Sequence, residues 1–82
     1  MTWQEREISK NQLEKILQTL DLDEGIRIEN KSNMIFLNRL AKRYCVNIST
    51  QSKEEFFYRD NVRDVLDFLN EKIEEPSAIF SY

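Results

Sequence analysis

Glycine and proline, the residues that most readily build tight turns, each occur only once in this chain of 82 residues. An antiparallel sheet needs several tight turns, and such turns draw heavily on these two residues. Charged residues make up 33% of the chain and hydrophobic residues 40%, which is the composition of a folded rather than a disordered protein. We therefore expect an all-α fold, and the length allows a single domain, residues 1–82.

The absence of histidine excludes several kinds of site. Without it there is no Ser-His or Cys-His nucleophile and no histidine-containing zinc site. The segment that begins at Asp21 hints at a calcium loop, but Gly25 comes one residue too early for that pattern. We therefore expect neither an enzyme nor a metal site.

The sequence leads us to expect no secretion signal and no membrane span. No apolar run has the length of a signal peptide or of a membrane span. Cys45 is the single cysteine and cannot form an internal disulfide, which suits a reducing compartment. A cytoplasmic protein that does not interact with membranes is the expectation.

The first helix has a clear start. Ser9 and Gln12 form a capping box, so a helix is predicted to begin at about residue 10. A stripe of apolar residues at helical spacing follows, formed by Leu13, Ile16, Leu17 and Leu20. The next segment has no helical period, and we expect Ile26 and Ile28 to reach the core from a loop.

Three further helices are predicted downstream. A second helix is expected over residues 33–45, a short third one after Ser52, and a last one that Asp60 or Asn61 caps and Pro76 stops. The apolar face of the second helix comprises Met34, Phe36, Leu37, Leu40, Ala41 and Tyr44. Val62, Val65, Leu66, Leu69 and Ile73 form the stripe of the last helix.

The order of these apolar positions leads to a family resemblance. Met34, Phe36, Leu40, Tyr44 and Ile48 occupy in one register the apolar positions of an acyl carrier protein, and NVRDVLDFL is similar to the closing helix of that family. The resemblance implies a four-helix bundle, with three long helices and one short one. Residues 1–8 and 77–82 would then be tails open to fraying. It also implies docking onto partner proteins during acyl or peptidyl thioester biosynthesis, as in fatty acid or polyketide synthesis.

The attachment site of the carrier arm departs from the family pattern. Glu29, Asn30 and Lys31 stand where the family has Asp-Ser-Leu, and asparagine cannot accept a phosphopantetheine arm. Ser32 is the nearest hydroxyl, although its position also suits a helix cap. We therefore expect no cofactor, and an active carrier modified with 4'-phosphopantetheine at Ser32 is the alternative.

A docking surface follows from the same expected helix. On a helical wheel, Ile35 lies opposite the buried stripe, among Asn38, Arg39 and Lys42. In the family, this face of the helix is the one offered to enzymes. The hypothesis is that these four residues contact a partner protein with an acidic patch, and that the protein is a monomer.

A helix-turn-helix DNA-binding module is the second alternative. Residues 40–49 resemble its centre, with Arg39, Lys42 and Arg43 as the cations. However, Gln51 and Glu54 are polar where the recognition helix should be apolar, and the net charge is -3. We therefore expect no nucleic acid partner.

Overall fold

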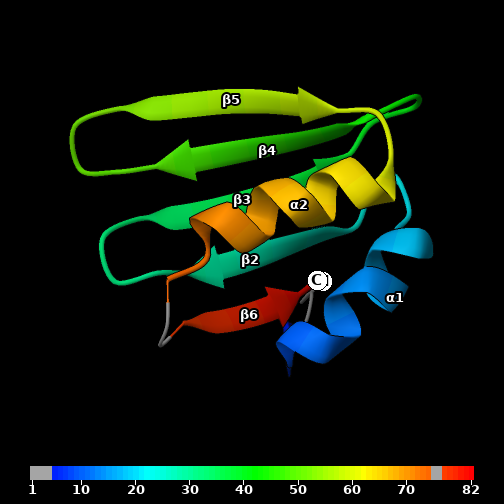
Figure 1. The fold of residues 1–82 in the computed structure, drawn as a ribbon, viewed down its shortest axis with the longest axis horizontal. Coiled ribbons are helices and arrows are strands. Elements are labelled where there is room, and N and C mark those ends of the chain that lie inside the picture. Colours follow the sequence, from blue (N-terminus) through cyan, green and yellow to red (C-terminus); the bar gives the residue numbers. More distant parts are fainter. Residues whose placement is uncertain (1–4, 75–76) are drawn as a thin grey trace.

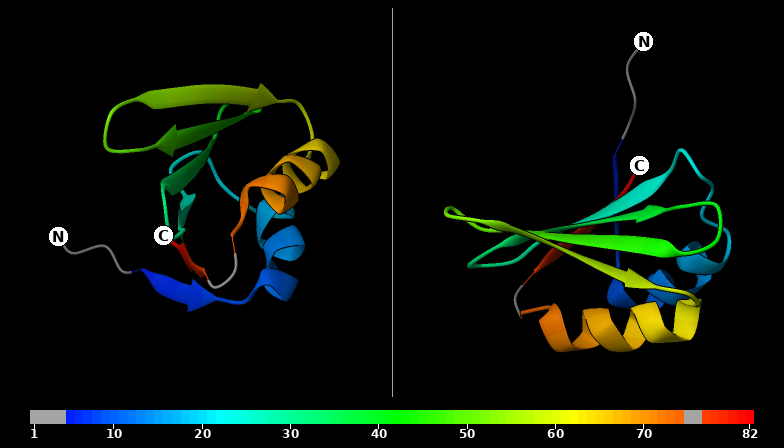
Figure 2. Two further views of the ribbon diagram at one scale, coloured as in Figure 1. Left: turned by 60° about the vertical axis from the view of Figure 1, so that its left-hand side comes forward. Right: turned by 90° about the horizontal axis from the view of Figure 1, so that it is seen from above.

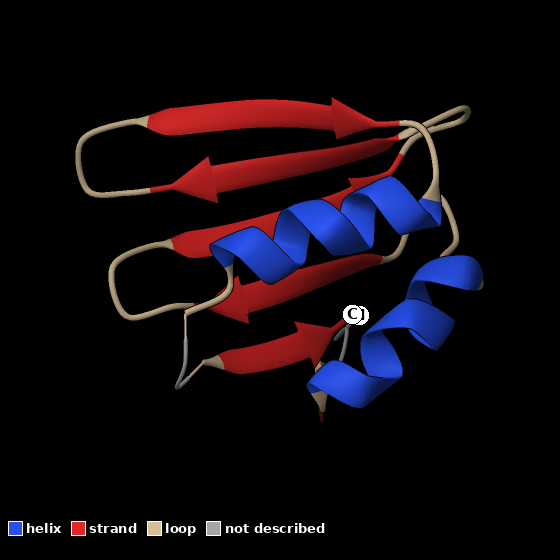
Figure 3. Cartoon of the chain, in the orientation of Figure 1, coloured by secondary structure: helices blue, strands red, loops and turns tan. Residues whose placement is uncertain are grey.

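The computed structural model describes residues 5–74 and 77–82, and its centre is a six-stranded antiparallel sheet (Figures 1 and 3). The elements in chain order are β1 (Arg6–Ile8), η1 (Lys10–Gln12), α1 (Leu13–Gln18), β2 (Gly25–Glu29), β3 (Met34–Arg39), β4 (Tyr44–Ser49), β5 (Glu54–Arg59), α2 (Val62–Lys72) and β6 (Ala78–Ser81). Across the sheet the strand order is β1-β6-β2-β3-β4-β5. The expected all-α four-helix bundle is therefore wrong.

Both α-helices lie on the same face of the sheet (Figure 2). Strands β2 to β5 form a meander in which each strand pairs with the next. Strand β6 returns after α2 and pairs with β1 on one side and β2 on the other. The molecule thus has two layers, and the second face of the sheet carries none of the described helices.

Three tight turns join the strands of the meander without any glycine or proline. They are residues 30–33, 40–43 and 50–53, and in each the amide of the first residue donates to the carbonyl of the fourth. In the first turn Asn30 Nδ2 also donates to Asn33 Oδ1 at 2.8 Å. In the last one Thr50 Oγ1 accepts from the Lys53 amide at 3.2 Å. In the first and last of these turns, asparagine and threonine therefore do what we had expected of glycine and proline.

Residues 33–45 form β3 and the start of β4 instead of a helix. Ile35 and Leu37 are fully buried under the helices, and Phe36 between them lies on the opposite face. In β4 the buried residues alternate in the same way: Tyr44, Val46 and Ile48. The helix was wrongly predicted because closely spaced apolar residues satisfy both periods, and Leu40 and Ala41, which continue the helical period, lie exposed in the turn at 40–43. The expected short helix after Ser52 is strand β5.

The first and last helices are confirmed. The Ser9 amide donates to Gln12 Oε1 at 2.9 Å, and the chain enters α1 through one 3-10 turn. Asn61 caps α2, since its Oδ1 accepts from the Asp64 amide at 2.9 Å. Pro76, expected to stop the last helix, lies outside the described residues. Local side-chain signals therefore located both helix starts correctly.

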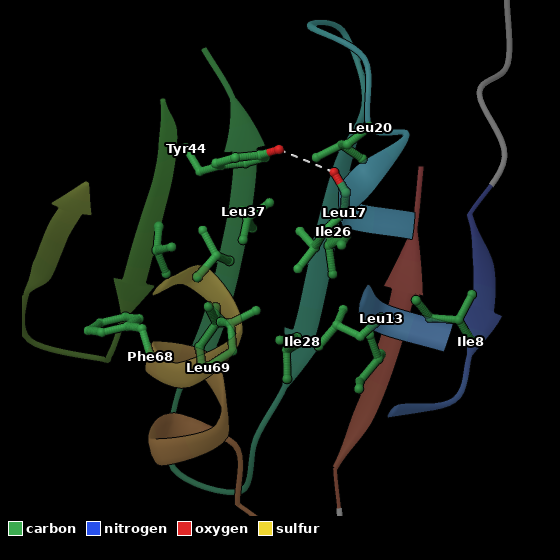
Figure 4. Packing of buried hydrophobic residues seen from close by; sticks show 14 of the residues in the cluster. Ile8, Leu13, Leu17, Leu20, Ile26, Ile28, Leu37, Tyr44, Phe68 and Leu69 are labelled. Carbon is green, nitrogen blue, oxygen red and sulfur yellow. Dashed lines mark hydrogen bonds between the residues drawn. The ribbon is translucent and has the colours of Figure 1, made fainter. Parts of the chain in front are cut away.

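The core lies between the helices and the sheet (Figure 4). Its fully buried side chains come from both layers: Leu13, Leu17, Ile26, Ile28, Ile35, Leu37, Val46, Val65 and Leu69. The prediction that Ile26 and Ile28 reach the core is confirmed, but they do so from strand β2. The Tyr44 hydroxyl donates to the Leu17 carbonyl at 3.3 Å and so links β4 to α1.

The segments expected to fray take part in the sheet. Residues 6–8 form β1, and residues 78–81 form β6 beside it. Ile8 and Ile79, which face each other across this pair, are both buried. Residues 1–4, also assigned to the tail, lie outside the described part. Both ends of the fold are thus held by strand pairing.

Candidate functional site

The sheet face opposite the helices, here called the open face, is the candidate site. Its residues are Glu7, Gly25, Arg27, Glu29, Met34, Phe36, Asn38, Cys45, Asn47, Ser49, Glu54, Phe56, Tyr58, Ala78 and Phe80, which alternate with core residues along each strand. Neighbouring strands lie about 4.8 Å apart, so side chains in register form continuous rows.

One such row crosses the whole sheet. Its members follow from the pairing register and run Glu7, Phe80, Arg27, Phe36, Asn47 and Phe56, one from each of the six strands. Three of these side chains are phenylalanine, spread from β6 to β5. This row therefore places an aromatic side chain on each of β6, β3 and β5.

The aromatic side chains become more exposed toward β5. Phe80 and Phe36 are half-buried, whereas Phe56 is 58% exposed and its near neighbour Tyr58 is 48% exposed. Large apolar side chains that are exposed and adjacent, rather than scattered, mark interaction sites. The β5 end of the open face is therefore its most accessible apolar part.

Arg27, in β2, stands between Phe80 and Phe36 in this row. Its guanidinium lies 4.5 Å from the centroid of the Phe80 ring. Nε and Nη2 each donate to one oxygen of Glu5 at 2.7 Å, and Nη1 donates to Glu29. These contacts raise the pKa of Arg27, mainly through the hydrogen bonds to Glu5, and the same hydrogen bonds lower the pKa of Glu5. The positive charge of Arg27 is therefore paired with carboxylates of the same chain.

Acidic groups outnumber basic ones on this face. Glu7 and Glu54 add negative charge beyond the group around Arg27. Near β5 a further cation, Arg43, stands beside the face. It lies 5.9 Å from the Tyr58 ring centroid and pairs with Asp60 at 3.8 Å. The open face thus combines aromatic surface with a net negative rim.

The expected docking residue Ile35 is not on the surface. It is 0% exposed and packs in the core on the helix side of β3. The helical wheel had placed it outside because a strand alternates its side chains every second residue. Ile35 is therefore corrected from a partner contact to a core residue.

The remaining residues of that expected surface do not share one face. Asn38 is exposed on the open face, at the end of β3. Arg39 points to the helix side, where its Nη1 donates to the Leu20 carbonyl at 2.7 Å. Lys42 is exposed in the turn that leads to β4. Because the segment is a strand and a turn, the helix-turn-helix geometry of the second alternative is absent here.

Asn30 and Ser32 hold the first turn of the meander against the end of α2. Asn30 Nδ2 donates to the Lys72 carbonyl at 2.9 Å, and its Oδ1 accepts from the Glu74 amide at 3.0 Å. The Ser32 hydroxyl lies 3.0 Å from both carboxylate oxygens of Glu74. Ser32 therefore does not cap a helix, contrary to one expectation.

The hollows of the surface are shallow. One of them, about 500 Å³, lies between α1 and the end of β6 and is lined by Ile16, Leu20, Glu24 and Tyr82 among others. Within residues 5–74 and 77–82, no cluster of three potential metal ligands occurs. None of the helices described is long and apolar enough to cross a bilayer. The open face is therefore the feature with the most distinctive chemistry.

Because the sequence was interpreted as helical, it did not indicate the open face. Phe56 and Tyr58 stand two residues apart, and so do Arg27 and Glu29, which is the period of a strand. That alternation is visible in the sequence, but pairing across strands requires the register, which only the structure supplies.

Comparisons of the chain with protein-family models, with curated proteins and with solved structures gave no match.

Proposed function

We propose that the protein is a non-catalytic binding module whose open face docks a partner protein with an apolar patch surrounded by basic groups. The row that crosses the sheet through Phe80, Phe36 and Phe56 is the observation that carries the proposal. Aromatic side chains provide much of the binding energy in protein interfaces. Glu7, Glu54 and the other acids of the rim favour a cationic partner surface through charge complementarity.

A role as a carrier protein is not part of this proposal. The resemblance to acyl carrier proteins depended on helices over residues 33–45 and after Ser52, and both segments are strands. Only the expectation of a protein partner is retained, with the predicted charge reversed. The earlier hypothesis required an acidic partner, whereas the rim of the open face suits a basic one.

Aromatic residues on an open sheet could also stack on the bases of single-stranded nucleic acid. Such proteins combine stacking with cations that contact phosphates, and their binding depends strongly on salt. On the open face, Arg27 is paired with Glu5 and Glu29, and Arg43 is paired with Asp60. The excess of acids would repel phosphates, so a protein partner fits better.

Two synthetic peptides and one oligonucleotide test this chemistry by fluorescence anisotropy. The peptides alternate leucine with lysine or leucine with glutamate, and the oligonucleotide is oligothymidylate. We expect the lysine peptide alone to bind. Phe56→Ala should weaken this binding about tenfold, which is typical of an interface hot spot. Leu22→Ala is the matched control, because Leu22 is 60% exposed but lies in the loop after α1.

Three outcomes would contradict the proposal. Equal binding of both peptides would show that the acidic rim does not select the partner. Equal effects of Phe56→Ala and Leu22→Ala would show that binding does not use the open face. Salt-sensitive binding of oligothymidylate would assign the face to nucleic acid instead.

A further inference from the structure

Strand β5 ends the sheet and offers a second surface, distinct from the open face. It is six residues long and pairs with β4 without interruption from Glu54 to Arg59. On its other side no described strand follows it, as Figure 1 shows. Proteins usually protect such an edge, because its free backbone groups can pair with another strand.

The direction of the free backbone groups follows from the turn before β5. The Thr50 amide donates to the Lys53 carbonyl at 2.9 Å, so the backbone groups of Lys53 face β4. In an antiparallel pair these groups alternate sides from one residue to the next. The residues whose backbone groups point outward are therefore Glu54, Phe56 and Tyr58. The Tyr58 carbonyl accepts from Arg59 Nη1 at 2.7 Å and keeps a second lone pair for another donor.

We propose that a second copy of this chain pairs antiparallel with β5 across a two-fold axis at Phe57. A closed two-fold contact requires that outward-facing residues meet each other and that both open faces lie on the same side. With Phe57 on the axis, Phe56 of each copy forms its backbone hydrogen bonds with Tyr58 of the other. The two sheets then become one continuous sheet with a shared open face.

Charge complementarity selects this register. It places Glu55 of one copy opposite Arg59 of the other, twice by symmetry, and both side chains lie on the helix side of the sheet. With Phe56 on the axis instead, Lys53 would face Arg59 and two like charges would meet. A register centred on Tyr58 overlaps fewer residues of β5.

The groups that would meet are accessible in the single chain. Glu55 is exposed and makes a 3.9 Å ion pair with Lys53, which is also exposed. Such a surface pair is weak and can yield to a better-placed partner. Arg59 is half-buried and lies 4.6 Å from the Phe68 ring centroid, which holds its guanidinium near the edge of the sheet. The site for Glu55 is thus partly formed before pairing.

The same register brings Glu54 opposite Asp60 of the second copy. These are like charges, but Asp60 is paired with Arg43 of its own chain at 3.8 Å. The incoming carboxylate of Glu54 therefore meets an ion pair rather than a lone negative charge. The contact between Glu54 and Asp60 therefore opposes pairing, and the nearby charge of Arg43 reduces that repulsion.

Charge exchange tests the proposed pairing in sedimentation equilibrium. We expect the wild type to form a dimer, and Glu55→Arg or Arg59→Glu to weaken it at least about tenfold, because each places like charges opposite each other twice. The double variant should restore the dimer. Within one chain Glu55 and Arg59 are four residues apart on an extended strand, so only pairing between copies explains the rescue. Circular dichroism verifies that each variant folds.

A backbone variant provides a second test if Arg59→Glu fails to fold. Phe56→Pro removes an amide that points away from β4, so the sheet of the single chain keeps its hydrogen bonds. It should abolish the dimer. A wild type that stays monomeric at millimolar concentration overturns the proposal. So does a dimer that survives Phe56→Pro, or one that the single charge reversals leave unchanged. The dimer does not depend on the peptide binding proposed above, so either result can fail alone.

Discussion

Replacement of Ile35 gives the most direct test of the sheet. Its side chain, from the second residue of β3, is 0% exposed and packs in the core. Truncation of a fully buried isoleucine to alanine costs about 2–5 kcal/mol, from lost burial and from the cavity left behind. Since small domains have a free energy of unfolding near the lower end of about 5–15 kcal/mol, Ile35→Ala should remove much of it.

A matched set of variants, measured by urea unfolding, makes this test specific. Ile35→Val should cost only about 0.5–1.5 kcal/mol, because it removes a single methyl group. Leu40→Ala, at a residue 41% exposed in the turn after β3, should change the free energy of unfolding by about 0.5 kcal/mol or less. Ile35→Glu should prevent folding, because it buries a carboxylate without a partner.

Phe36→Ala distinguishes the strand from a helix over the same residues. A helix would bury Phe36 and expose Ile35, whereas β3 buries Ile35 fully and leaves Phe36 half-buried on the open face. If Phe36→Ala costs more than Ile35→Ala, or if Ile35→Glu folds with unchanged stability, the assignment of faces in β3 is refuted.

Three further predictions concern other parts of the fold. Gly25→Ala should lower the free energy of unfolding by about 1–3 kcal/mol in urea titrations, because its Cβ would lie 2.9 Å from the Leu37 carbonyl oxygen. Glu5→Gln should lower the urea midpoint at pH 7. The difference from wild type should vanish as the pH falls through the folded pKa of Glu5, which Arg27 holds below its ordinary value of 4.5. Coexpression with a phosphopantetheinyl transferase should leave the intact mass unchanged, and a mass increase lost in Ser32→Ala would refute this.

The sequence correctly predicted the two α-helices, but it did not predict the strands β2 to β5 between them. Ser9 and Asn61 are caps whose hydrogen bonds act within three residues, so a short segment contains the whole signal. The strands depend on partners far along the chain. Apolar residues between 33 and 45 fit a helix equally well, and only pairing with β2 and β4 decides between the two.

The candidate site could be predicted from the sequence even less. Phe80 and Phe36 lie in one row because both pair with Arg27, on either side of β2. Nothing in their sequence spacing indicates this pairing. The scarcity of glycine suggested that turns were absent, although Asn30 and Thr50 stabilise them with their side chains. The prediction that Ile35 lies on the surface was wrong because it assumed a helix where the chain forms a strand.

The position of β6 between β1 and β2 has a consequence for the folding pathway. Strands β2 to β5 are joined by short turns, so their contacts are local and can form early. Among the described strands, β1 pairs only with β6, and Ile8 meets Ile79 from almost the opposite end of the chain. Closing so long a loop is entropically costly and must precede that contact. We therefore expect the N-terminal strand to become ordered last, despite being first in the chain.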